Sequence, residues 1–128
     1  MGERTAESYA WKTLMDVGVL VGGGSDCPVE DYSPLWGIHC AVNRPTSQED
    51  PTPFLPDQAL TPEEAAAIYT VNAAKLVHAE TDLGTLEAGK LADLVVLDRD
   101  LFAVPHQQIK DLSVCLTMAG GKITYEAQ

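Results

Sequence analysis

The stretch Val17-Gly-Val-Leu-Val-Gly-Gly-Gly-Ser-Asp-Cys-Pro-Val29 carries the strongest fold signal in the chain. Its first five residues are mostly apolar without polar alternation, a pattern typical of a buried strand in a parallel sheet. Three glycines and Pro28 then end the strand, because glycine permits positive φ and close backbone approach while proline cannot continue a ladder. The sequence therefore predicts a strand at residues 17–21 with Ser25 and Asp26 at its carboxyl end, where α/β folds place their sites.

Asp26 has a simpler interpretation beside the functional one. Gly-Ser-Asp is common in loops, so this aspartate could be an ordinary turn or cap residue. A phosphate-binding loop is excluded, because the glycines form no Gly-x-Gly-x-x-Gly pattern and no Lys-Ser or Lys-Thr follows them.

The composition is that of a globular chain with a strongly negative net charge. Its 128 residues suffice for one domain or a piece of a larger one, and 45% apolar content is enough for a packed core. With 19 acidic and 8 basic side chains, the formal net charge of -11 repels phosphate backbones and anionic lipid. We therefore expect no nucleic-acid partner and no membrane partner.

The sequence carries no recognisable targeting or membrane-spanning signal. No run of about 18 apolar residues occurs, and the amino terminus lacks a basic stretch followed by an apolar core. Cys27, Cys40 and Cys115 are odd in number and form no Cys-x-x-Cys pair, which argues against a disulfide framework or a thiolate zinc site. These features predict a cytoplasmic protein whose cysteines are reduced and mostly buried.

The first part of the chain is predicted to be mainly helical. An amphipathic helix is expected over residues 3–16, and another begins near Ser33-Pro34, where serine caps and proline fits the first turn. The proline-rich residues 45–56 predict a surface loop. Thr61-Pro62-Glu63-Glu64 predicts a capping box, and Thr70 is expected to separate the helix that follows from a second one.

The last part of the chain is predicted to form a small antiparallel sheet. Leu94-Val-Val-Leu97 is a β-branched run between two aspartates, which is typical of a short strand. Residues 113–119 and 122–126 alternate apolar and polar side chains, and the Gly120-Gly121 link between them suits a type I′ turn. We therefore expect α/β barrel material at the front of the chain and a hairpin at its end.

Four motifs, taken in order, resemble the carboxyl-terminal portion of the amidohydrolase superfamily, and the first looks closest to the YtcJ-like branch. They are Gly24-Ser-Asp-Cys-Pro-Val29, Tyr69-Thr-Val-Asn-Ala-Ala74, Leu83-Gly-Thr-Leu-Glu-Ala-Gly-Lys-Leu-Ala-Asp-Leu-Val-Val-Leu-Asp98 and Met118-Ala-Gly-Gly-Lys-Ile-Thr-Tyr125. The resemblance covers nearly the whole chain. It implies an incomplete α/β fold, with the last strand and helices of a metal-dependent (β/α)8 barrel in residues 1–80 and strands of a small β-sandwich in residues 81–128.

The resemblance also implies a role for Asp26. In the family, the aspartate after the last barrel strand ligates a divalent metal, for which zinc is expected, and takes the proton of the attacking water. One carboxylate can do both, because one oxygen binds the cation while the other accepts a proton. Asp26 is therefore the candidate catalytic residue and the candidate metal ligand of a hydrolase that acts on carbon-nitrogen bonds, other than peptide bonds, in a small-molecule substrate.

The chain departs from the family pattern in its other ligands. The family also needs a His-x-His near the first strand, a bridging lysine or glutamate and further histidines, and this sequence has none of them. His39, His78 and His106 lack the spacing and are interpreted as surface or structural residues. We therefore expect this chain alone to bind no cofactor tightly and to be inactive, because one carboxylate does not hold a catalytic zinc.

Several other conspicuous residues are left out of the predicted site. Lys90 and Asp93 belong to the sandwich by resemblance, so they are expected to shape turns away from the metal. Arg44, Tyr32 and Trp36 follow the carboxyl end of the predicted last strand and could reach a substrate, but the helix and loop that cover a barrel need such residues anyway.

Two functional hypotheses remain open from the sequence. The chain is either the carboxyl-terminal part of a metal-dependent hydrolase or a non-enzymatic module for assembly or binding that derives from the same fold. In both cases we expect it to self-associate or to pair with a missing amino-terminal portion, because the strand and hairpin would otherwise expose apolar faces and open sheet edges.

Overall fold

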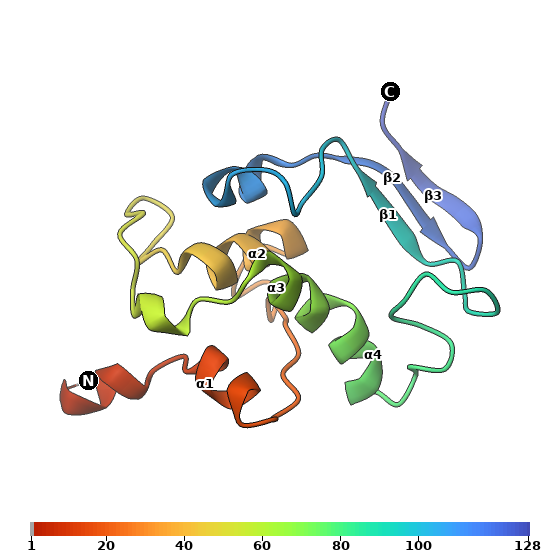
Figure 1. Cartoon of the computed structure of the whole chain (residues 1–128). Helices are drawn as coiled ribbons and strands as arrows, with labels where there is room; N and C mark the ends of the chain where they lie inside the picture. Colours follow the sequence, from red (N-terminus) through yellow and green to blue (C-terminus); the bar gives the residue numbers. More distant parts are fainter. Residues whose placement is uncertain (1) are drawn as a thin grey trace.

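The computed structural model describes the backbone of residues 2–128 and their side chains except that of residue 3. Helices form the first part of the chain and a small sheet the last part (Figure 1). The α-helices are α1 (Trp11–Asp16), α2 (Pro34–Asn43), α3 (Pro62–Tyr69) and α4 (Val71–Leu76). Three short 3-10 helices are η1 (Gly2–Glu7), η2 (Pro56–Gln58) and η3 (His106–Asp111), and the strands are β1 (Leu94–Leu97), β2 (Val114–Ala119) and β3 (Lys122–Glu126). None of these described helices has the length and apolarity needed to cross a bilayer.

The core lies between α2, α3 and η3. It consists of buried apolar side chains from these elements and from the turn before α3, namely Ile38, Ala41, Val42, Leu60, Ala65, Ile68 and Ile109. Ile109 is 0% exposed and lies in η3, which follows β1 and precedes β2 in the sequence. The chain after residue 80 thus contributes to the helical core, while the domain boundary placed there stays a prediction.

The helix starts predicted near Ser33-Pro34 and at Thr61 are confirmed, and at Thr61 the predicted capping box is present as well. Thr61 and Glu64 form the full capping box, with Thr61 Oγ1 accepting from the Glu64 N–H at 3.2 Å and Glu64 Oε2 accepting from the Thr61 N–H at 2.9 Å. Helix α2 begins at Pro34 as expected, but the Ser33 side chain makes no capping bond. Thr70 separates α3 from α4, and its hydroxyl donates to the Ala66 carbonyl at 2.9 Å instead of capping α4.

The predicted sheet is confirmed, with the antiparallel strand order β1-β2-β3. Gly120 and Gly121 have φ of +56° and +77°, as the first and second central residues of a type I′ turn require. Asp93 Oδ1 accepts from the Gly120 N–H at 2.6 Å, and Lys90 Nζ donates to the Glu80 carbonyl at 2.8 Å. Both residues therefore hold turns, as the sequence indicated.

The predicted strand at residues 17–21 is wrong for the described chain. The segment has no regular secondary structure from residue 19 to residue 25, and Val17 and Val19 are 72% and 47% exposed. A parallel strand needs a neighbour to complete its ladder, and within residues 2–128 the three strands pair with one another. The apolar run therefore lies on the surface beside α4 instead of inside a sheet.

The predicted continuous helix over residues 3–16 is also wrong. The structure has η1 and α1 with Tyr9 between them at a φ of +52°, so the helix is interrupted after its first half. Most helical stability comes from packing an apolar face, and Ala6 and Tyr9 of the predicted face are exposed. The break leaves Trp11 free to pack against the core at the start of α1.

Candidate functional site

A hollow of about 1050 Å³ lies beside the loop that follows the glycines. Its walls come from residues 21–25 and 29–31, from α2, from residues 44–49 and from the end of α3. Aromatic side chains form much of the lining, including Tyr9, Trp11, Trp36, Phe54 and Tyr69. Polar side chains, including Ser25, Arg44 and Glu49, line it as well. A concave space that combines aromatic walls with polar groups is typical of a small-molecule site.

Close backbone packing fixes one wall of the hollow. A Cβ on Gly23 would lie 2.7 Å from the Tyr69 ring, and a Cβ on Gly37 would lie 1.9 Å from the Tyr69 hydroxyl oxygen. The Gly23 N–H donates to the Ile68 carbonyl at 2.9 Å. Neither Gly23 nor Gly37 has a positive φ, so glycine is needed here for close approach and not for backbone conformation.

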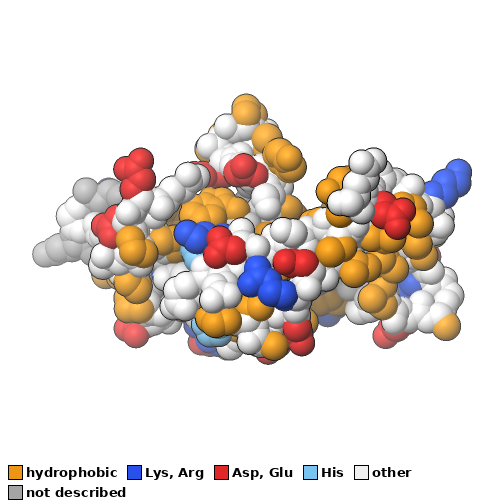
Figure 2. Space-filling model, turned by 90° about the horizontal axis from the view of Figure 1, so that it is seen from above, with side chains coloured by type: hydrophobic (Ala, Val, Ile, Leu, Met, Phe, Trp, Pro, Cys, Tyr) orange, Lys and Arg blue, Asp and Glu red, His pale blue; other side chains and the backbone are white. Residues whose placement is uncertain are grey.

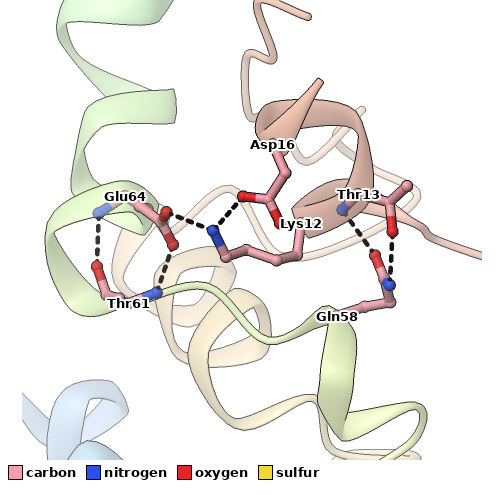
Figure 3. A network of polar contacts seen from close by, with 6 residues as sticks. All are labelled: Lys12, Thr13, Asp16, Gln58, Thr61 and Glu64. Carbon is pink, nitrogen blue, oxygen red and sulfur yellow. Dashed lines mark hydrogen bonds and ion pairs between the residues drawn. The ribbon is translucent and has the colours of Figure 1, made fainter. Parts of the chain in front are cut away.

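A polar network ties α1, which leads into this loop, to the start of α3 (Figure 3). Lys12 Nζ binds both Asp16 and Glu64, the latter at 3.0 Å, and these hydrogen bonds raise the pKa of Lys12. The Glu64 pKa is lowered, first by the bond from the Thr61 backbone. The Thr13 N–H donates to Gln58 Oε1 at 3.0 Å and Gln58 Nε2 donates to Thr13 Oγ1 at 2.8 Å, so η2 is held as well.

Asp26 lies in an exposed turn next to the hollow and not in its wall. It has a φ of +50°, and its carbonyl accepts from the Val29 N–H at 2.9 Å. Ser25, its neighbour, does line the hollow. The geometry within the described chain is that of a turn residue with a solvent-accessible carboxylate.

The described residues do not fit a complete metal site. Among the side chains that the structure describes, no three of histidine, cysteine, aspartate or glutamate come together in a way that could hold an ion. His78 and His106 are exposed. His39 is buried, with its ring stacked on Trp36 at 5.2 Å between centroids and 3.2 Å from the Asn43 side-chain amide, so it is structural as predicted.

The cysteines divide by exposure. Cys27 is exposed, contrary to the expectation of mostly buried thiols, because it lies in the same surface turn as Asp26. Cys40 lines the hollow, and burial raises the pKa of its thiol to about 11. A thiol that stays protonated at neutral pH is a poor nucleophile. Cys40 is therefore not activated for covalent catalysis.

Arg44 lies in the wall of the hollow, although it was not predicted as a site residue. Its side chain is 5% exposed, its Nε donates to the Phe54 carbonyl at 3.1 Å, and its guanidinium carbon lies 4.6 Å from the Trp11 ring centroid. Burial lowers the pKa of Arg44. Its place after the predicted strand made it conspicuous in the sequence, but its aromatic neighbours could not be foreseen, because they come from residues 9–11 and from across the loop after α2. Trp36 also lines the hollow, whereas Tyr32 is 80% exposed.

Known proteins resemble this chain over nearly its whole length. Residues 1–125 match the profile of the amidohydrolase family. The chain is 38% identical over 125 residues to YtcJ of Bacillus subtilis (strain 168), which is named as an amidohydrolase, covering 97% of this chain and 24% of that protein. It is 37% identical over 115 residues to N-substituted formamide deformylase of Arthrobacter pascens, covering 90% of this chain and 21% of that enzyme.

A solved structure shares the fold. An amidohydrolase from Thermotoga maritima MSB8 superimposes with a TM-score of 0.68 at 23% identity, covering 95% of this chain and 26% of that one. The chain thus spans about a quarter of the length of the proteins it matches. Because the family profile matches residues 1–125, the chain belongs to the amidohydrolase family.

Proposed function

We propose that this chain forms the carboxyl-terminal part of a metal-dependent hydrolase that cleaves carbon-nitrogen bonds other than peptide bonds in small molecules. The observation that carries the proposal is the family match over residues 1–125, which includes the loop of Asp26. The deformylase that resembles the chain over 115 residues acts, by its name, on N-substituted formamides, which contain such a bond. An amide of a small molecule is therefore the substrate class we propose.

Asp26 is the proposed contribution of this chain to the metal site. Its carboxylate is exposed in a turn, so it is free to meet groups from outside residues 2–128. A catalytic zinc needs three protein ligands and an open position, and the described residues supply no such cluster. We propose that the remaining ligands come from chain beyond this segment, and that the metal is zinc.

A chimera with a relative tests this function. The segment of the Arthrobacter pascens deformylase that matches this chain is replaced by residues of the chain, and formate release is measured from an N-substituted formamide that the unmodified enzyme cleaves. We expect the chimera to be active and Asp26→Asn to remove activity and lower the metal content. Asp57→Asn, at an exposed carboxylate in η2 that does not line the hollow, is the matched control and should leave both unchanged.

An active chimera that keeps its activity in Asp26→Asn would refute the role of Asp26. A folded chimera with full metal content and no activity would favour the alternative, a non-enzymatic assembly module. The exposed sheet favours that alternative, since Val96 and Ile123 are 46% and 55% exposed. Apolar side chains gather on the part of the molecule that holds the sheet, at the right of Figure 2.

A further inference from the structure

The charge of Arg44 is not balanced by the described chain. Among the described side chains, those of residues 4–128, no carboxylate forms an ion pair with Arg44, and its Nη2 is buried without a hydrogen-bond acceptor. Buried polar atoms are almost always paired, and a buried charge without a partner costs far more than a neutral group. Because Arg44 lines the hollow, its guanidinium group is a candidate partner for an anionic ligand.

The surroundings of Arg44 favour a carboxylate that carries an apolar body. Three aromatic rings enclose the guanidinium, with centroids 4.6 Å away for Trp11 and 6.0 Å away for both Tyr9 and Phe54. These rings hold the planar group in place and offer apolar surface beside it. A guanidinium recognises a carboxylate by directed hydrogen bonds, which a neutral amide does not match.

The acidic residues of the hollow do not fill this role. Glu30, Asp31 and Glu49 line it but are exposed. Burial and then the nearby Tyr9 are the causes that act on the pKa of Arg44, and no carboxylate is among them. Arg44 is the one basic side chain among the described residues of the lining.

We propose that the hollow is a binding site for a small organic carboxylate, which Arg44 recognises by charge and the aromatic lining holds by its apolar part. The hollow of about 1050 Å³ is large enough for a small molecule. This site goes beyond the proposed hydrolysis, because it needs neither Asp26 nor a metal.

The test compares phenylacetate with its neutral isostere phenylacetamide on the 128-residue chain, followed by tryptophan fluorescence, since Trp11 and Trp36 both line the hollow. We expect phenylacetate to bind at least about tenfold more tightly, a difference that corresponds to about 1.4 kcal/mol. The formal charge of -11 repels anions in general, so a preference for the anion requires a local cation.

Arg44→Met should abolish the preference for phenylacetate, and Arg44→Lys should keep part of it. Circular dichroism of each variant checks that it is folded. Equal affinity of the two probes for the unchanged chain, or no binding of either at about 10 mM, would overturn the proposal without any variant. A folded Arg44→Met that keeps the preference would overturn it too.

Discussion

The side-chain amide of Asn72 donates a hydrogen bond of 3.1 Å to the backbone carbonyl of Val21. This bond joins α4 to the segment that leads into the Asp26 loop, across 51 residues of sequence. Together with the bond from the Gly23 N–H to the Ile68 carbonyl, it fixes an irregular segment that pairs with no strand of the described chain. Through Asn72, the motif Tyr69 to Ala74 thus fixes the position of the segment that precedes the Asp26 loop.

Asn72→Ala should destabilise the chain by about 1 kcal/mol, because it removes the bond and leaves the Val21 carbonyl without its donor. Urea denaturation followed by circular dichroism measures the change. Lys75→Ala, on the exposed side of the same helix, is the matched control and should change stability by less than about 0.5 kcal/mol. Equal effects of the two substitutions would show that the Asn72 bond contributes nothing.

Two adjacent glycines should respond in opposite ways to alanine. Gly23→Ala places a Cβ 2.7 Å from the Tyr69 ring, so we expect a loss of about 1–3 kcal/mol from overpacking. Gly24→Ala meets no atom within 4 Å and has no positive φ, so it should be neutral or stabilise by up to about 1 kcal/mol. Thermal unfolding of both variants decides this, and a stable Gly23→Ala would mean that the contact with Tyr69 is looser than described.

Stability should fall as the pH drops below about 6.5, because burial, and then the Lys110 charge, lower the pKa of His39. The unfolded state binds a proton at this residue before the folded state does, so the free energy of unfolding decreases with decreasing pH. The lowered pKa of Glu64 acts in the same direction, but only at more acidic pH.

Urea denaturation between about pH 8 and pH 5 measures this slope. His39→Gln should flatten it, whereas His78→Gln, at an exposed histidine, should leave it unchanged. The same slope in His39→Gln and in the unchanged chain would assign the pH dependence to other groups.

The chain should self-associate through its sheet. Leu94, Val96, Leu116, Met118 and Ile123 share one face by register, and β1 and β3 are open edges in the described chain. Light scattering at micromolar concentration should show a dimer or larger species, because pairing covers the apolar face and the edges. Val96→Lys should shift it toward the monomer, and Gln107→Lys, with the same charge change at an exposed site in η3, should not. A compact monomer that binds no hydrophobic dye would contradict this prediction.

The sequence predicted local structure best where the chemistry is local. The capping box of Thr61 and Glu64 and the Gly120-Gly121 turn depend on neighbours a few residues apart, and both are confirmed. Residues 17–21 were predicted as a strand from their apolar pattern, but a strand requires pairing partners that residues 2–128 do not supply. The apolar pattern of a segment indicates which side chains it could bury, but not whether a neighbouring strand is present to pair with it.

The candidate site was predictable only in part. Motif resemblance indicated the family and the loop of Asp26, and the family is confirmed by the match over residues 1–125. Arg44 was left out because its importance comes from burial, from the rings of Trp11 and Phe54 and from an unpaired Nη2, and none of these is visible in a sequence. Long-range packing, and not residue type, distinguishes it from an ordinary loop arginine.

Zinc titration calorimetry of the purified 128-residue chain tests the central claim most directly. We predict no binding tighter than that of an exposed aspartate, because Asp26 has no second and third ligand beside it in the described residues. Glu30→Gln and Asp26→Asn should then give the same weak heats as the unchanged chain. One equivalent of zinc bound with a Kd below about 1 μM, lost in Asp26→Asn and kept in Glu30→Gln, would contradict the claim that the metal site is completed from outside this chain.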